Sequence, residues 1–182
     1  GGKVAVYKEN LYKPMPGYRF IASNTDRSRY YVGELNGRSS KQAYMDALHI
    51  SESNIINQPF HNPLGKMNGQ DICIISLKEV SGNGLCCYSQ VNDSDVLVLL
   101  EEQDYNEILD ETLQRIRRDF NHISGVFSIN CVFRYLLFSQ EHHMEDYLKT
   151  MSTLGDHAGL IGFGEHYNQQ FVNQTMTCVV FE

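Results

Sequence analysis

The chain has 182 residues, of which 42% are hydrophobic, which suits one folded domain or two small domains that share a core. Its formal net charge of −7 disfavours nucleic acid and anionic membranes as general partners, because both require clustered Lys and Arg. There is neither a signal-peptide pattern nor an apolar run near the roughly 20 residues that span a bilayer, so we expect a cytoplasmic protein without membrane contact. Since the first residue is Gly1 and not Met, we expect a processed chain or, preferably, an expressed fragment.

The first half of the chain predicts strands around one short helix. Strands are expected at Arg19 to Ala22 and Tyr30 to Leu35, and a helix from Ser39 or Ser40 to about Leu48. The segment 57–69 contains two prolines and two glycines and predicts a loop. Three strand segments, starting at Asp71, Asn83 and Asp95, follow with short turns, which indicates antiparallel hairpins.

The second half alternates helices and strands. Asp104 begins the clearest helix, in which acids precede Arg115, Arg117 and Arg118, and we expect this arginine cluster to be a solvated helix end. A buried strand is predicted for residues 125–130 and an amphipathic helix for residues 143–154. Two apolar runs, 158–163 and 175–181, flank a polar loop, and this pattern predicts a closing hairpin with a polar tip.

This order of elements is typical of an α+β protein. We expect mostly antiparallel β-sheets covered by amphipathic helices, with a layered α/β sandwich as one possible arrangement. The five cysteines form no CxxC pair, are odd in number and lie mainly in apolar runs. They are therefore predicted to be buried, reduced thiols.

Four segments resemble the FIST sensory domain, named for F-box and intracellular signal transduction proteins. They are "YYVGELNGRSSKQAYMDAL", "HNPLG", "FSINCVFRYLLF" and "GLIGFGEHYNQQFVNQTMTCVVFE". The resemblance covers about Tyr12 to Glu182 and points to the C-terminal half of that domain. Residues 12–182 would then be the FIST C-terminal domain, and residues 1–11 a remnant or last strand of the preceding N-terminal half.

The resemblance implies a sensory input module that binds a small molecule such as an amino acid or a related metabolite. Its implied partners are this ligand, the N-terminal FIST half and a fused or partner signalling output domain. It also draws attention to residues that match the family pattern: Ser128, Cys131, Arg134, Gly164, Glu165, Asn173 and Thr175. The chain departs from the pattern at Phe133, where Gly is usual, and at His166, where an apolar residue commonly follows Gly-Glu.

The chemistry of these residues suggests an ionic ligand. Arg134 lies in an apolar run and must find a partner, since an unpaired buried charge is very costly. An Arg and a Glu that face one pocket would match a zwitterionic amino acid, so Arg134 and Glu165 lead the expected ligand-binding set. The remaining members of that set are Cys131, Asn173, Thr175, Gly164 and His166. The alternative is a plain salt bridge between Arg134 and a structural acid such as Glu165.

The sequence also allows two other functional interpretations, an enzyme and a protein-docking module. If Val132 begins a helix, Cys131 would lie at its N-terminus, where a thiolate is favoured, and a cysteine-dependent hydrolase or transferase is the enzymatic alternative. A protein-docking module is the third reading. The late histidines show no HxxxH or HExxH spacing, so we expect no metal ion and no cofactor. We favour a binding module over an enzyme.

Overall fold

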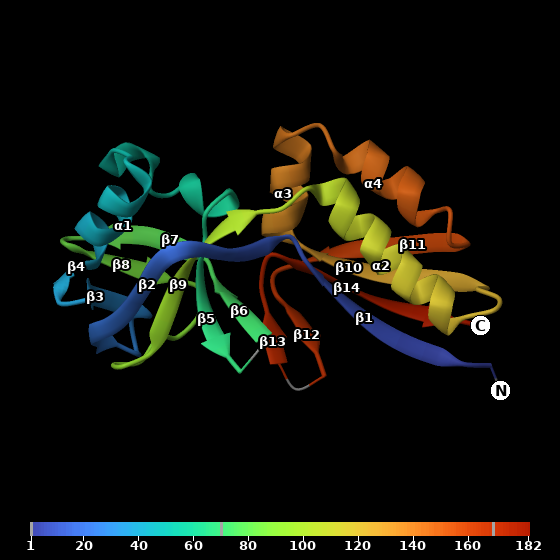
Figure 1. Cartoon of the computed structure of the whole chain (residues 1–182), viewed down its shortest axis with the longest axis horizontal. Helices are drawn as coiled ribbons and strands as arrows, with labels where there is room; N and C mark the ends of the chain where they lie inside the picture. The colour runs from blue at the N-terminus through green and yellow to red at the C-terminus, as the bar shows by residue number, and fades with distance from the viewer. Residues whose placement is uncertain (1, 70, 169) are drawn as a thin grey trace. The chain divides into compact units, whose positions relative to one another are not determined.

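The computed structural model describes residues 2–69, 71–168 and 170–182, and its elements divide into two compact units (Figure 1). Unit 1 combines residues 1–11 with residues 103–182, and unit 2 contains residues 12–102. Strands outnumber helices and most strand pairs are antiparallel, so the expected α+β class is confirmed.

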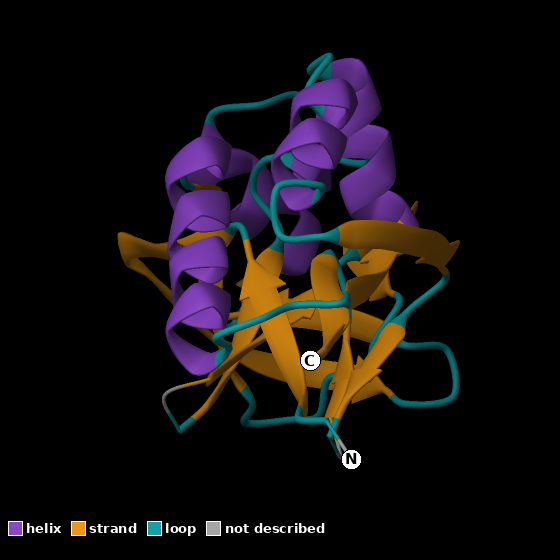
Figure 2. Cartoon of the chain, turned by 90° about the vertical axis from the view of Figure 1, so that its right-hand side faces the viewer, coloured by secondary structure: helices purple, strands orange, loops and turns teal. Residues whose placement is uncertain are grey.

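Unit 1 is a sheet with helices on one face. Its four-stranded sheet has the order β1-β14-β10-β11. In Figure 2, where this unit faces the viewer, the helices lie on one side of the strands. The elements are β1 (Val4–Asn10), α2 (Tyr105–Asp119), β10 (Gly125–Cys131), α3 (Val132–Gln140), α4 (Met144–Met151), β11 (Asp156–Gly162), β12 (Glu165–Tyr167), β13 (Gln170–Val172) and β14 (Thr175–Phe181).

The helix predicted to start at Asp104 is confirmed. Asp104 is the N-cap of α2, and its Oδ1 accepts hydrogen bonds from the backbone N–H groups of Asn106 and Glu107. The apolar stripe of α2 is buried through Leu109, Leu113 and Ile116. The helix predicted for residues 143–154 is shorter than expected, because α4 ends at Met151.

The closing hairpin predicted for 158–163 and 175–181 is wrong. β11 pairs with β10 in parallel, and β14 pairs antiparallel with both β10 and β1, so β10 separates the two apolar runs. The connection from β10 to β11 contains α3 and α4, which is long enough for a parallel crossover. The polar segment between the two runs instead forms its own small hairpin, β12 with β13.

Unit 2 is a curled, mainly antiparallel sheet with the strand order β6-β5-β9-β2-β3-β8-β7, and β4 pairs with β3. The long strand β2 pairs first with β9 and then with β3. Its elements are β2 (Tyr12–Asp26), β3 (Tyr31–Leu35), β4 (Arg38–Ser39), α1 (Ser40–Leu48), η1 (Glu52–Asn54), η2 (Gln58–Phe60), β5 (Leu64–Asn68), β6 (Asp71–Ile75), β7 (Leu77–Ser81), β8 (Gly84–Cys87) and β9 (Val96–Glu102).

Several strand predictions in unit 2 need correction. The segment 57–69, predicted as a loop, contains η2 and β5, and β5 pairs with both β6 and β9. The run that starts at Asp71 is two strands, which separate at the fully buried Ser76. β9 does not pair with β8 but lies between β2 and β5. Local apolar patterns predict that strands exist but not which strands become neighbours.

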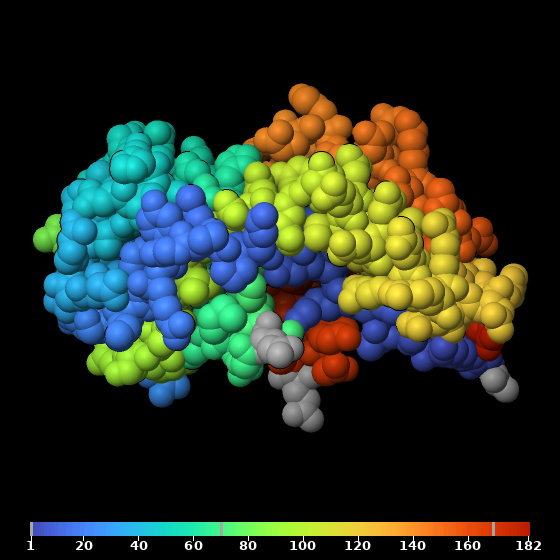
Figure 3. Space-filling view, in the orientation of Figure 1, coloured from blue at the N-terminus to red at the C-terminus, as the bar shows by residue number. Residues whose placement is uncertain are grey.

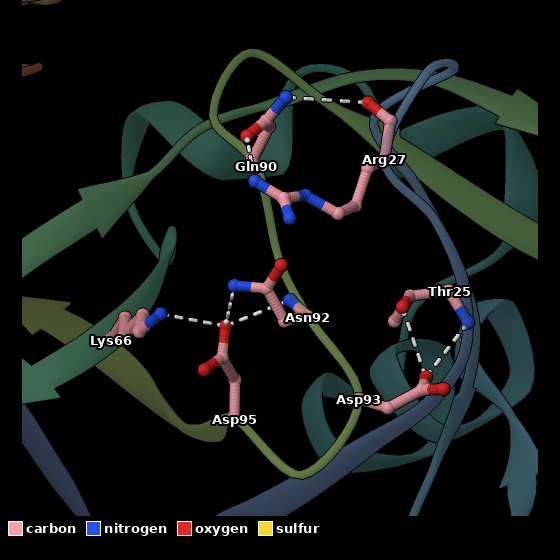
Figure 4. Close-up of polar contacts among 7 residues, drawn as sticks. All are labelled: Thr25, Arg27, Lys66, Gln90, Asn92, Asp93 and Asp95. Carbon is pink, nitrogen blue, oxygen red and sulfur yellow. Dashed lines mark hydrogen bonds and ion pairs between the residues drawn. The ribbon is translucent and has the colours of Figure 1, made fainter.

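A polar loop fixes the start of β9. Asp95 accepts hydrogen bonds from Lys66 Nζ at 2.7 Å and from the backbone N–H of Asn92 at 2.8 Å. Asp93 accepts from the backbone N–H and the hydroxyl of Thr25, which joins the loop to β2 (Figure 4). These carboxylates bond to backbone and side-chain donors of their own unit, so we assign them a structural role.

Candidate functional site

Residues that are far apart in the sequence meet inside unit 1, where β10 ends. Cys131 is the last residue of β10 and the N-cap residue of α3, a helix start that the sequence suggested only as one alternative. Glu165 opens β12 and Thr175 opens β14. Thr175 Oγ1 donates a hydrogen bond to Glu165 Oε2 at 3.3 Å, and Glu165 also bonds to the Cys131 side chain.

Arg134 forms an ion pair with Glu9 of β1. Arg134 Nη2 donates to Glu9 Oε1, and each side chain is only 1% exposed. The guanidinium also lies over the rings of Phe138, at 4.6 Å from the centroid, and Tyr147, at 5.5 Å. Glu165 was the acid suggested as the partner of Arg134, but the ion-pair partner is Glu9.

This buried ion pair leaves charged atoms without partners. Arg134 Nε and Nη1 and Glu9 Oε2 are buried and have no hydrogen-bond partner among the described residues. Glu165 Oε1 is likewise buried and has no hydrogen-bond partner among these residues. Buried polar atoms are normally hydrogen-bonded, and unpaired ones cost about 1–3 kcal/mol each, more when they are charged. The four atoms therefore present two donors and two acceptors that the protein itself does not use.

The carboxyl group of Glu165 is poised to titrate near neutrality. Burial raises its pKa to about 7, although hydrogen bonds from Thr175 and Cys131, the backbone N–H of Gly164 and the charge of Arg134 act in the opposite direction. A carboxyl group that changes charge near pH 7 is characteristic of functional sites.

The Cys131 thiol is buried, and its environment favours the protonated form. Burial raises the pKa of the thiol, and the negative charge of Glu165 raises it further. The backbone N–H groups of Gln174, Phe133 and Arg134 lower the pKa but do not offset these effects. The thiolate considered as an alternative at the N-terminus of α3 is therefore disfavoured, because burial and Glu165 outweigh the helix terminus.

Asn173 and Gly164 lie beside this group. Asn173 is buried, and its Oδ1 is 3.6 Å from the position that a Cβ atom of Gly164 would occupy. Gly164 has φ = +114°, and such a Cβ atom would also meet the Phe171 ring at 2.4 Å. Glycine is therefore required to turn the chain into β12.

His166 lies apart from the buried group. Neighbouring residues of a strand point to opposite faces, so the buried Glu165 and the exposed His166 diverge. The His166 ring packs against Phe171 at 5.5 Å between centroids. The described contacts thus gather Cys131, Arg134, Glu165, Thr175, Asn173 and Gly164. His166 instead lines a separate pocket of about 160 Å³ with sheet residues such as Phe127 and Thr177.

Sequence reasoning missed Glu9. The alternation of residues along the strand "VAVYKEN" could have identified it, because residues two positions apart lie on one face and Glu9 therefore shares a face with Tyr7. Both side chains are buried, and Tyr7 OH donates to Asp119 Oδ2 of α2. An acid on the buried face of a strand indicates a buried partner, and that partner was already visible as Arg134.

A groove of about 400 Å³ lies between β1 and α2, and Glu9 belongs to its lining. The two elements, blue and yellow-green, are side by side in Figures 1 and 3. The lining is strongly charged: Lys8, Glu9, Asn10, Ile108, Glu111, Thr112, Gln114, Arg115 and Arg118. Two members of the arginine cluster expected to be a solvated helix end thus line a groove, and Arg115 Nη2 donates to the Lys8 carbonyl.

The profile of the FIST C domain matches residues 41–168, more than two thirds of the chain. The chain belongs to the FIST C domain family. This membership indicates a sensory domain of signal transduction. The matched range contains Cys131, Arg134, Gly164, Glu165 and His166, whereas Glu9, Asn173 and Thr175 lie outside it. No curated protein and no solved structure gives a significant match to the chain.

Within residues 2–69, 71–168 and 170–182, no group of three or more His, Cys, Asp or Glu side chains is arranged to hold a metal ion. Across the same part of the chain, no helix combines the length and the apolar character needed to cross a membrane.

Proposed function

We propose that this FIST C domain is a cytoplasmic input module that binds an amino acid or a related zwitterionic metabolite. The observation that supports the proposal is the set of four unpartnered charged atoms around Arg134, Glu9 and Glu165. A ligand carboxylate would accept from the free Arg134 nitrogens, and a ligand ammonium would donate to the free oxygens of Glu9 and Glu165. Thr175, Asn173, Gly164 and Cys131 would form the surrounding wall.

The site is buried, so binding requires an opening. The groove between β1 and α2 reaches Glu9, and we assign it as the ligand's route. A ligand that favours one arrangement of these elements would shift the population toward that arrangement and signal to an output domain. His166, which lines a separate pocket, would have no direct role in this site.

The experiment is a thermal-shift screen of the 182-residue chain with amino acids, amines and small carboxylic acids. A ligand at 100 times its Kd stabilises the folded state by about 2.7 kcal/mol, which corresponds to several degrees in Tm. We expect an amino acid to produce this shift, Glu165→Gln to remove it and Glu141→Gln, a change in an exposed acid elsewhere in unit 1, to retain it. The proposal is wrong if no zwitterion stabilises the chain, or if the Glu165→Gln variant responds like the wild type.

An uncovered apolar face supports a partner domain. Val4, Val6, Phe127 and Phe181 lie on one face of the sheet because β-partners share a face, and their exposed fractions are 59, 47, 38 and 40%. This face is opposite to the helices, since Tyr7 and Glu9 alternate with Val4 and Val6. We assign it to the N-terminal FIST half, and residues 1–11 would provide the strand that continues from that half. Titration calorimetry with a FIST N-terminal half tests this assignment: the wild type should bind, and Phe127→Lys should not.

A further inference from the structure

A second pocket of unit 1 lies apart from the charged cluster, between the sheet and α4. Its volume is about 300 Å³, which is within the range of small-molecule sites, about 300–1,000 Å³. Strands β10 and β11 form its floor and helices α3 and α4 its walls. The lining residues are Ser128, Asn130, Tyr135, Met144, Tyr147, Leu148, His157, Gly159, Leu160 and Ile161.

A directed chain of hydrogen bonds forms the inner end of this pocket. Asn130 Nδ2 donates to Tyr147 OH at 3.0 Å, and Tyr147 OH donates to Ser128 Oγ at 3.4 Å. Ser128 Oγ and His157 Nε2 are 2.8 Å apart. Since Ser128 already accepts from Tyr147, its own hydroxyl proton is available for His157 Nε2. Burial lowers the pKa of His157, which favours the neutral imidazole that this direction requires.

One acceptor remains unused at the end of this chain. Asn130 is buried, with 7% of its surface exposed, and its Oδ1 atom has no hydrogen-bond partner among the described residues. A buried amide oxygen of this kind costs about 1–3 kcal/mol relative to a satisfied one. Asn130 also lines the pocket, so an unused hydrogen-bond acceptor lies close to the space that a ligand would occupy.

The rest of the pocket is apolar or aromatic and carries no Asp, Glu, Lys or Arg among its described lining residues. Leu148 and Ile161 lie near its mouth and are 46 and 44% exposed. Gly159 keeps the floor open beside Ser128, because a Cβ atom there would lie 2.6 Å from Ser128 Oγ. An ion would lose its hydration in such a pocket without gaining a counter-charge.

We propose that this pocket binds a neutral small molecule with an aromatic or alicyclic body and one N–H or O–H donor, which bonds to Asn130 Oδ1. The site is distinct from the proposed zwitterion site and requires no charged ligand group. Tyr147 connects the two sites, because its hydroxyl belongs to the pocket and its ring lies against the guanidinium of Arg134. An occupant of the pocket thus contacts the same side chain that packs on the charged cluster.

The test compares indole with indene in the full 182-residue chain. The two bicyclic molecules have similar shapes, but only indole carries an N–H donor. We expect saturable binding of indole by titration calorimetry or ligand-observed NMR, and about 2–10-fold weaker binding of indene, which is the value of one net hydrogen bond. Indole-3-carboxylate should bind more weakly than indole, because the pocket has no cation to receive it.

Two matched variants locate the site. Leu148→Trp fills the mouth of the pocket from α4 and should weaken indole binding at least tenfold. Leu136→Trp changes a residue of α3 that is 39% exposed and lies outside the lining, and it should leave binding unchanged.

A third variant tests the hydrogen bond: Asn130→Ser should remove the preference for indole over indene. A merely structural role of Asn130 would weaken both ligands equally.

The outcomes separate this inference from the zwitterion proposal. Glu165→Gln should not alter indole binding, whether or not an amino acid stabilises the chain. The inference is overturned by absence of saturable indole binding, by equal affinities for indole and indene in the wild type, or by a Leu148→Trp variant that binds like the wild type.

Discussion

Arg134 of α3 and Glu9 of β1 are 125 positions apart and form an ion pair inside unit 1, with each side chain 1% exposed. The pair joins the edge strand of the sheet to the helix that follows β10. A buried pair adds little net stability over an apolar pair, yet loss of one member leaves an uncompensated charge. The pair therefore makes the interior of unit 1 sensitive to charge, and an ionic ligand could exploit this property.

Removal of one partner should destabilise the chain strongly. We expect Glu9→Gln to lower the free energy of unfolding by about 3–5 kcal/mol, measured by urea denaturation, because Arg134 is then left buried and unpaired. The double variant Glu9→Leu/Arg134→Met should recover most of this loss. As a control, Lys149→Met, which breaks the exposed pair with Glu145, should have no measurable effect. A small effect of Glu9→Gln would contradict the buried pair.

Stability should depend on pH through Glu165. Its pKa rises from an ordinary value of 4.5 to about 7 in the folded chain, so between these values the folded state binds the proton more tightly than the unfolded state. The contribution of Glu165 therefore becomes less favourable as the pH rises from 4.5 to 7. Glu165→Gln cannot ionise and should be more stable than the wild type above pH 7, by an amount on the order of 3 kcal/mol at most.

The comparison is made by urea unfolding at several pH values. The difference between Glu165→Gln and the wild type should shrink as the pH falls and disappear below about 4.5. If the two proteins keep a constant difference across this window, Glu165 does not titrate as described.

Amino-acid binding should release protons near neutrality. A ligand ammonium favours the ionised carboxylate of Glu165, so binding lowers the pKa of this group and affinity rises as the pH increases through about 7. Titration calorimetry in two buffers with different ionisation enthalpies measures the released protons. Binding without proton exchange would place the ammonium elsewhere.

Cys131 should react slowly with alkylating reagents. The side chain is 1% exposed, and both burial and Glu165 raise the pKa of its thiol. Of the five cysteines, Cys73 is the one that is not fully buried. With iodoacetamide at pH 7 and mass-spectrometric mapping, we expect Cys73 to be modified first and Cys131 only on unfolding. Fast modification of Cys131 in a Cys73→Ser variant would contradict this prediction and support the hypothesis of a cysteine-dependent enzyme.

Gly159 should not tolerate a side chain. Its Cβ atom would lie 2.6 Å from Ser128 Oγ and 2.8 Å from the Ser128 carbonyl oxygen, so Gly159→Ala must displace β10 or β11. We expect a loss of about 1–3 kcal/mol in the free energy of unfolding, as for overpacked cores. Gly125→Ala is the matched control on the same strand pair, because its nearest contact would be 3.5 Å. Similar stabilities for the two variants would contradict this packing.

Local features of the chain were predictable from the sequence. The start of α2 at Asp104 and the start of α1 after Ser39 follow from capping and from apolar periodicity, which act over a few residues. Helix α3 was not predicted, because a helix start at Val132 was considered only as one alternative and Cys131 supplies no side-chain cap. The α+β class and the FIST resemblance likewise depend on the order of local patterns. The need of Arg134 for a buried acid was also evident, because an apolar run cannot hold an unpaired guanidinium.

The tertiary structure alone decided which segments became neighbours. Strand pairing is set by the packing of whole faces and by the crossover through α3 and α4, so β11 joined β10 in parallel although the local pattern favoured a hairpin with β14. For the same reason, the acid that Arg134 required proved to be Glu9 and not Glu165. Short-range propensities determine each strand and helix, whereas a charged partner 125 positions away is selected only when the sheet assembles.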